Sequence, residues 1–381
     1  MADNNENKVL NVPHLRFPEF SGEWNKYTIN DLATVVGGGT PDTTVKSYWG
    51  GDIQWFTPSE IGKNKYVDFS KRTITRDGLD NSSAKLLPLH TILLSSRATV
   101  GECSIASNEC TTNQGFQSLI AKQCNIDFLY YLIQTKKKDL IRNACGSTFL
   151  EISANEIRKI KVAVPVQNEQ EQIAKLLSLI DERIATQNKI IEDLKKLKSA
   201  ITDLLFHSIA DAHTIRLGKI AHITNGAGDV QDANTEHQED WYPFFDRSEE
   251  LKWFPTYSFD KEAVIYAGEG QSFYPRYYNG KFALHQRCYA ITDFASCIIP
   301  KYCYHFMNTL NSYFVRNSVG STVPSLRMDI FQKVEIRLPP IPKQQYICKI
   351  IDAFYTKLEV EQRGISILQE LKQFLLSQMF I

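Results

Sequence analysis

The apolar positions in two stretches of the chain recur at alternating steps of four and three residues. In the first stretch they are Ile173, Leu177, Ile180, Ile184, Ile191, Leu194 and Ile201. In the second stretch they are Ile347, Ile351, Phe354, Leu358, Ile365, Leu368 and Leu375. A period of about 3.5 residues held over about five heptads is typical of a coiled coil. The pattern therefore predicts two long helices whose seams bury each other.

One alternative stays open on this pattern, namely two amphipathic helices that each pack on a domain of their own. A helix of about 40 residues is about 60 Å long and would overhang a small domain, which favours the coiled coil. Asn168, with Glu171 three residues later, has the pattern of a helix N-cap. Polar residues interrupt the two seams at matching places: Gln187 and Lys198 in the first, Glu361 and Lys372 in the second.

The two helical stretches belong to a longer internal repeat. Residues 142–206 align with residues 316–380 without a gap, and 15 of the 65 positions are identical. The match starts with RNACGST and RNSVGST, in which Gly146 and Gly320 are expected to form turns that other residues would strain. Upstream the match is weaker, with LATVVGGGTPD facing LGKIAHITNGAGD and TNQGFQSLIA facing LHQRCYAIT. We conclude that the chain is duplicated.

The segments before each long helix alternate β-branched and aromatic residues between glycine, proline and serine turns, which indicates strands. Helical periodicity appears in IDFLYYLIQTKKKDLIRNA and in PKYCYHFMNTLNSYFVRNS. The predicted class is α+β, with two strand-rich mixed α/β domains, two long helices and a pseudo-twofold relation from the duplication. The predicted divisions are a flexible tail (1–12), a first domain (13–166), a central helix (167–208), a second domain (209–340) and a C-terminal helix (341–381).

A search for catalytic chemistry finds no site. GGGTPD lacks the Lys-Ser/Thr of a phosphate-binding loop, and the chain has neither a nucleophile elbow nor an HExxH motif. The eight cysteines are scattered without CxxC pairs, so a reducing cytoplasm is expected and a metal site is not. No apolar run reaches the roughly 20 residues that span a bilayer, so no membrane association is expected. These observations predict a binding module.

A binding module built from two similar halves suits a target with two similar halves, such as duplex DNA read at two places. Basic and polar residues alternate in the first domain, for example Lys63 beside Asn64. The formal net charge of the chain is nevertheless zero, which is unusual for a protein that binds DNA by itself. Basic side chains are therefore expected on one face of each domain.

The chain also resembles a known family, the specificity (S) subunits of Type I restriction-modification systems. In the first half the resemblance lies in PHLRFPEFSGEW, LATVVGGGTP, QWFTPSEI, SSRATVGE, TNQGF and VPVQNEQEQIAKLLSLID. In the second half it lies in YPFFDRS, NGKFALHQRCYAI and LPPIPKQQYICKIID. It covers the chain from about Pro13 to the C-terminus.

The resemblance implies two target recognition domains that each read one half of a bipartite, asymmetric double-stranded DNA site, with two antiparallel helices setting the gap. It implies no catalysis and no cofactor in this chain. Two modification (methyltransferase) subunits would bring S-adenosylmethionine and methylate adenine, and restriction subunits would bring ATP and Mg. The residues expected to bind DNA are Thr40, Thr57, Ser59, Lys63, Arg97, Thr99, Asn113 and Gln114, and in the second domain Arg247, Ser248, Tyr274, Arg276, His285 and Gln286.

Two other interpretations stay open on the sequence. One is a coiled-coil scaffold or adhesin-like protein whose globular ends bind protein or glycan. Aromatic residues near the loops would suit sugars, namely Trp49, Trp55, Trp241, Trp253, Tyr277 and Tyr278. The other lies within the same binding class, a specificity subunit that serves a fused Type IIB or Type IIG enzyme.

Overall fold

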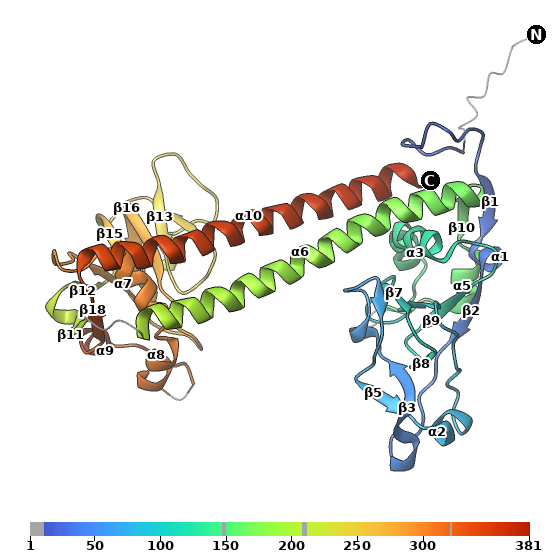
Figure 1. Ribbon diagram of the computed structural model, residues 1–381, viewed down its shortest axis with the longest axis horizontal. Coiled ribbons are helices and arrows are strands. Elements are labelled where there is room, and N and C mark those ends of the chain that lie inside the picture. The colour runs from blue at the N-terminus through green and yellow to red at the C-terminus, as the bar shows by residue number, and fades with distance from the viewer. Residues whose placement is uncertain (1–10, 147–149, 208–211, 321) are drawn as a thin grey trace, which may run out of the picture. The chain divides into compact units, whose positions relative to one another are not determined.

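The computed structural model describes residues 11–146, 150–207, 212–320 and 322–381 (Figure 1). The chain divides into two compact units. Unit 1 runs to Lys189 and also takes in Gln362–Ile381, whereas unit 2 comprises Ile190–Glu361. Both units contain parts of the two long helices, α6 (Gln167–His207) and α10 (Ile341–Met379). Residues 1–10 of the predicted tail (1–12) lie outside the described residues.

In the described part of unit 1, ten strands form three sheets. They are β1 (Asn25–Thr28), β2 (Ala33–Gly37), β3 (Trp49–Phe56), β4 (Tyr66–Val67), β5 (Arg72–Ile74), β6 (Ile92–Leu94), β7 (Cys103–Ala106), β8 (Cys110–Thr112), β9 (Gln117–Ala121) and β10 (Lys161–Val164). The main sheet has the order β2-β9-β6-β7-β4, the second has the order β5-β3-β8, and β1 pairs with β10. Every residue of β6 and β7 is buried, because both faces of these strands are covered.

Short helices complete the first domain. They are α1 (Ile29–Leu32), α2 (Arg76–Asp80), α3 (Ile126–Thr135), α4 (Lys137–Arg142), α5 (Ala154–Lys159) and two 3-10 turns, Lys46–Tyr48 and Pro58–Glu60. Asn125 caps α3, since its side chain accepts a hydrogen bond from the Phe128 amide at 3.0 Å. Helix formation in this segment was predicted from its periodicity, and α3 and α4 confirm it.

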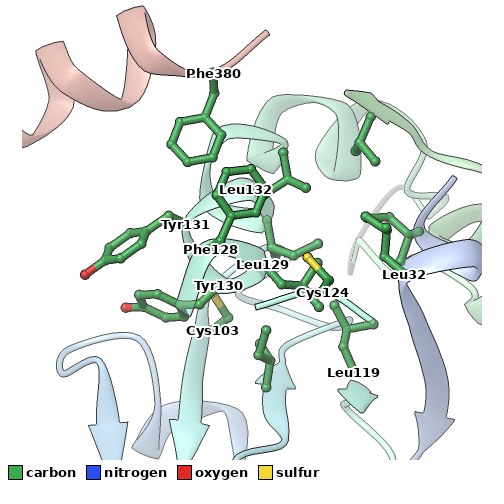
Figure 2. Close-up of a cluster of buried hydrophobic side chains, with 14 of the residues drawn as sticks. Leu32, Cys103, Leu119, Cys124, Phe128, Leu129, Tyr130, Tyr131, Leu132 and Phe380 are labelled. Carbon is green, nitrogen blue, oxygen red and sulfur yellow. The ribbon is translucent and has the colours of Figure 1, made fainter. Parts of the chain in front are cut away.

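Figure 2 shows the core of unit 1 around α3. Phe128 of α3 stacks on Phe380, the residue that follows α10, with ring centroids 5.2 Å apart. The Trp24 ring meets both of these rings edge-on. The last turn of α10 is therefore part of the first domain's core, together with Leu119 of β9 and Cys103 of β7.

Unit 2 repeats this plan with longer strands. They are β11 (His213–Arg216), β12 (His222–Asn225), β13 (Tyr242–Phe245), β14 (Lys252–Phe254), β15 (Phe259–Ala267), β16 (Arg276–Leu284), β17 (Cys288–Thr292) and β18 (Glu335–Leu338). The helices are α7 (Pro300–Met307), α8 (Asn311–Asn317), α9 (Met328–Gln332) and two 3-10 turns, Leu217–Lys219 and Val230–Asp232. The order β12-β17-β15-β16 matches β2-β9-β6-β7. The strands β13 and β14 correspond to β3 and β5 of the second sheet, since Phe244–Phe245 pair in parallel with Ala283–Leu284 as Trp55–Phe56 pair with Thr111–Thr112. The predicted α+β class and duplication are confirmed.

The predicted seam residues are all at least half-buried. Nine are buried, namely Ile173, Leu177, Ile180, Ile191, Ile347, Ile351, Leu358, Ile365 and Leu375. Five are half-buried, namely Ile184, Leu194, Ile201, Phe354 and Leu368.

The two long helices run antiparallel within each unit. In unit 1 Trp24 touches both Glu169 and Phe380, while Lys372 pairs with Asp181 at 2.7 Å. Later residues of α6 therefore meet earlier residues of α10. In unit 2 the Lys198 ammonium lies 4.0 Å from the centre of the Tyr355 ring, and Phe206 packs in one core with Ile347. The polar seam positions Lys372 and Lys198 thus have partners on the opposite helix. The predicted cap at Asn168 is wrong, since α6 already includes Gln167.

One buried glutamine in each domain, Gln170 or Gln344, fastens the domain to its long helix, and both do so in the same way. Gln170 donates to the Pro165 carbonyl at 2.9 Å and accepts from the Asn125 amide at 3.0 Å. Gln344 donates to the Pro339 carbonyl at 2.9 Å and accepts from the Ile299 amide at 2.9 Å. Each glutamine therefore joins the strand before the long helix to the start of α3 or α7.

The RNxxGST motif closes each of the two domains at a turn. Gly146 has φ +117° and Gly320 has φ +109°, both in the region that favours glycine. The turn predicted for these glycines is confirmed. Ser147, Thr148 and Ser321 of the motif lie outside the described residues.

Candidate nucleic-acid interface

Four loops of the first domain meet beside the ends of the central strands, and we call them the first loop face. They are residues 38–41, 57–60, 95–101 and 112–116. Backbone hydrogen bonds of 2.8–3.4 Å join them from amide to carbonyl: Gly38 to Phe116, Gly39 to Thr112, Asn113 to Phe56 and Ser96 to Gly115. Because these bonds involve the backbone alone, they do not depend on which polar side chains the loops carry.

The glycines of GGGTPD allow this close approach. A Cβ atom added to Gly38 would lie 2.0 Å from the Asn113 carbonyl oxygen, and one added to Gly39 would lie 2.3 Å from the Ala84 nitrogen. Neither distance is compatible with a side chain. The glycine-rich stretch thus lets the first loop pack directly against the backbone of its neighbours.

Most of the residues predicted for DNA binding in the first domain lie on this face. The Thr40 hydroxyl donates to the Gln114 side-chain oxygen, which links the first and fourth loops. The Thr57 hydroxyl and amide both bond to the Glu60 carboxylate, at 2.6 and 2.8 Å, in a capping box. Ser59, Thr99 and Gln114 are exposed. Asn113 is half-buried and accepts from the Gly115 amide at 2.9 Å.

Arg97 forms a bidentate ion pair on the same face. Its Nε and Nη2 atoms donate to the Glu151 carboxylate at 2.8–3.1 Å. Both side chains are a little under half exposed, so the pair orients the guanidinium without removing it from solvent.

Lys63 lies apart from these residues. It lines a groove of about 1480 Å³ in unit 1, between the 62–66 segment, α3 and the unit 1 part of α6. Lys65, next to it, is nearly buried and pairs with Asp127 at 2.7 Å. The structure therefore separates Lys63 from the other predicted residues of the first domain.

The second domain carries an equivalent set of loops, the second loop face, formed by residues 226–229, 245–249, 268–276 and 284–288. Here the amide-to-carbonyl bonds run from Gly226 to Cys288, Gly228 to Leu284, His285 to Phe245 and Gly268 to Arg287, at 2.9–3.2 Å. These acceptors and donors of the fourth loop each lie 172 residues after their counterparts in the first domain. The two faces thus share one backbone scaffold.

The predicted residues of the second domain also gather at this face. Arg276 donates to the Ser248 carbonyl, which joins two of the loops. Arg247 and Gln286 are exposed, and His285 is half-buried with its ring edge-on to Phe244. Tyr274 is 57% exposed on the segment that leads into β16.

An acid that the sequence did not single out supports the loop that contains Arg247 and Ser248. Asp246 is buried and pairs with Lys252 at 2.6 Å, and its other oxygen accepts from the Ser248 amide at 2.8 Å. Burial alone would raise the pKa of Asp246, but the Lys252 ammonium and the Ser248 amide hold that pKa below its ordinary value. The loop is therefore fixed by an ionised carboxylate.

Sequence reasoning also missed Glu269 and Arg287. The Arg287 Nη1 donates to the Glu269 Oε1 at 2.8 Å, on the second loop face. The alignment of TNQGF with HQRC did place Arg287 in the fourth loop, opposite Gly115. No local pattern connected it to Glu269, since 18 residues separate the two.

The described residues offer no catalytic constellation beside these loops. No group of three or more His, Cys, Asp or Glu side chains in the described ranges is arranged to hold a metal ion. Burial raises the pKa of Cys103, Cys110 and Cys124 to about 12, and that of Cys288 to about 11, so these thiols are poor nucleophiles. Among the helices of the described segments, none is long and apolar enough to cross a bilayer.

Comparison with known proteins agrees with a duplicated DNA-reading module. The family model of the Type I restriction modification DNA specificity domain matches residues 21–196 and again residues 210–373. The Type I restriction enzyme MjaIX specificity subunit of Methanocaldococcus jannaschii is 28% identical over 410 residues, covering 94% of this chain and 92% of its own. The solved S subunit of a Type-I restriction-modification system from M. genitalium superposes with a TM-score of 0.63 at 18% identity, over 97% of this chain and 99% of that one. The chain therefore belongs to the family of the Type I restriction modification DNA specificity domain and contains that domain twice.

Proposed function

We propose that this chain is the specificity subunit of a Type I restriction-modification complex and reads a bipartite, asymmetric site in double-stranded DNA. The observation that carries the proposal is the pair of loop faces, which have equivalent backbone bonds and different side chains. One scaffold with two sets of side chains is what two different half-sites require. In this proposal residues 13–166 and 209–340 are the recognition domains, and residues 167–208 and 341–381 are the helices between them.

The side chains on the two faces suit direct readout of bases. Amides such as Asn113, Gln114 and Gln286 can form two hydrogen bonds with adenine, and arginines such as Arg97 and Arg276 can do so with guanine. Hydroxyls such as those of Thr40, Thr57, Ser59, Thr99 and Ser248 can bond to bases or to phosphates. Lys63, which lies off the loop face, would contact phosphate.

The neutral charge of the chain fits a subunit that does not bind DNA alone. Phosphate contacts supply most non-specific affinity, so partner subunits would have to provide them. We propose two modification subunits, which carry S-adenosylmethionine and methylate adenine, and restriction subunits, which carry ATP and Mg. This chain would be non-catalytic, and the complex would act on cytoplasmic DNA.

The test is to produce the chain with its modification subunits and map N6-methyladenine in the host genome. We expect methylation at one bipartite sequence, and none with the chain or the modification subunits alone. Replacing Gln114 with Ala should alter the first half-site only, and replacing Gln286 with Ala should alter the second only. Methylation at scattered, unrelated sequences would contradict the proposal.

The helices can be tested separately from the loop faces. Deleting or inserting one heptad within residues 185–200 should change the number of base pairs between the half-sites and leave both half-sites unaltered. A change in the half-site bases would contradict this division of roles. The scaffold or adhesin-like alternative is not favoured by the family assignment, and it predicts no salt-dependent DNA binding by the assembled complex.

A further inference from the structure

The third loops of the two faces, 95–101 and 268–276, are held by equivalent pairs of β-bridges. In the first domain Arg97 forms a β-bridge with Glu151, and Glu151 forms another with Cys145. In the second domain Glu269 forms a bridge with Ser325, and Ser325 forms another with Val319. Glu151 and Ser325 are equivalent in the duplication, as are Cys145 and Val319. Glu269 therefore occupies the position of Arg97.

The fourth loop supplies the second equivalence. The Ser96 amide donates to the Gly115 carbonyl at 2.8 Å, and the Gly268 amide donates to the Arg287 carbonyl at 2.9 Å. Arg287 therefore occupies the position of Gly115, which has no side chain.

The side chains at these positions are exchanged between the domains. In the first domain the guanidinium comes from the third loop, as Arg97, and the carboxylate from Glu151. In the second domain the carboxylate comes from the third loop, as Glu269, and the guanidinium from the fourth, as Arg287. None of the equivalent positions keeps its residue type, yet each face has one arginine held by one carboxylate.

The exposure of the second pair indicates that folding alone does not explain it. Arg287 is 64% exposed and Glu269 is 20% exposed, and pairs this open to solvent contribute little to stability. Glu269 holds Nη1 at 2.8 Å. Within the described ranges, Nε and Nη2 of Arg287 have no hydrogen-bond partner. These two atoms form the edge of the guanidinium that donates to O6 and N7 of guanine.

We propose that Arg287 reads a guanine in the second half-site and that Glu269 is the positioning residue that orients it. This inference rests on the proposed function. The neighbours of Arg287, Gln286 and His285, lie in the same loop, so the three side chains would meet neighbouring bases. The first domain has Gly115 at this position and must read its half-site without such an arginine.

The experiment uses the complex of the full chain with its modification subunits and a plasmid library in which the second half-site is randomised. With the unaltered chain, methylation should require guanine at one position of this half-site. Arg287→Ala should reduce that discrimination on the order of tenfold to a hundredfold, as expected for loss of one bidentate base contact. Arg287→Lys should also reduce it, because an ammonium cannot form the planar fork. The first half-site should not change.

Glu269→Gln tests the positioning role, since the glutamine keeps the size of the side chain and removes its charge. It should weaken the guanine preference less than Arg287→Ala does, at the same base position. Lys261→Ala is the matched control, because Lys261 forms an exposed ion pair with Asp293 at 2.8 Å. This pair lies at the ends of β15 and β17 that are away from Glu269 and Arg287. This control should leave the half-site unaltered.

Three results would overturn the inference. The first is an Arg287→Ala complex with the same guanine preference as the unaltered one. The second is an equal loss of methylation on every sequence, which would mark a phosphate contact. If Arg287→Ala does not fold, Arg287→Lys decides, and an unchanged preference in that variant overturns the inference. Failure of the unaltered complex to methylate any bipartite sequence would instead refute the proposed function itself.

Discussion

The ion pair between Arg16 and Glu169 gives the sharpest stability prediction. The Glu169 side chain is fully buried at the start of α6, and Arg16 is 16% exposed. The Arg16 Nε and Nη2 donate to the two carboxylate oxygens at 2.7 and 2.8 Å, and the Trp24 indole donates at 3.2 Å. The hydrogen bonds to Glu169 raise the pKa of Arg16 above its usual value, so the guanidinium stays charged at any ordinary pH.

Replacing Arg16 with Ala should lower the free energy of unfolding of unit 1 by about 3–5 kcal/mol. The carboxylate of Glu169 would keep only the Trp24 hydrogen bond, and a buried charge left without its partner costs about this much. The comparison is Arg142→Ala, which removes an i,i+3 pair whose arginine is 75% exposed. An exposed pair of that kind contributes at most about 1 kcal/mol.

The assay is urea unfolding of the purified chain followed by tryptophan fluorescence, at low and at high salt. The loss from Arg16→Ala should persist at high salt, because a buried pair is poorly screened. The double variant Arg16→Met with Glu169→Leu should recover most of the stability, since an apolar pair can replace a buried ion pair. The reasoning is refuted if Arg16→Ala costs no more than Arg142→Ala.

Three further predictions concern other sites. Gln170→Ala and Gln344→Ala should each destabilise their own unit by about 2–3 kcal/mol in urea unfolding, because each leaves buried backbone groups unpaired; a loss below about 0.5 kcal/mol would contradict this. Gly38→Ala should abolish recognition of the first half-site in methylation mapping, because its Cβ would lie 2.0 Å from the Asn113 carbonyl oxygen; unchanged methylation would be the contrary result. Burial holds the pKa of His305 below its ordinary value despite Asp352. The free energy of unfolding of unit 2 should therefore be highest above about pH 6.5 and fall as the pH drops below that value. The variant His305→Phe should remove this fall.

Patterns with a period were readable from the sequence. The seam from Ile173 to Ile201 repeats every 3.5 residues, and the long helix α6 follows from it. The alignment of residues 142–206 with 316–380 likewise led to the duplicated fold. These features depend on residues close together in the chain, or on comparison of the chain with itself. The cap was misplaced, since Asn168 lies inside α6; a cap pattern says little about where the preceding turn closes.

Pairs between distant residues were not readable. Glu169 and Arg16 are 153 residues apart in the sequence. The residue aligned with Glu169 in the second half is the exposed Lys343, so the repeat did not indicate that Glu169 is buried. Lys63 belongs to a basic and polar stretch, yet the fold places it in a groove away from the loop face. The partners of such residues depend on which loops meet in three dimensions.

The two loop faces separate the demands of folding from those of recognition. Gly38 and Gly226 hold equivalent positions, and a Cβ at either would lie within about 2 Å of a carbonyl oxygen of the fourth loop, at Asn113 or Leu284. These glycines and the backbone bonds beside them position the loops mainly through the backbone, and a few side-chain links such as Thr40–Gln114 and Asp246–Lys252 add to them. The side chains of the fourth loop can therefore vary, and two of the three differ between the domains: the loop reads Asn-Gln-Gly in the first and His-Gln-Arg in the second. A substitution there can change the half-site at little cost in stability, because the frame that positions it is made of backbone.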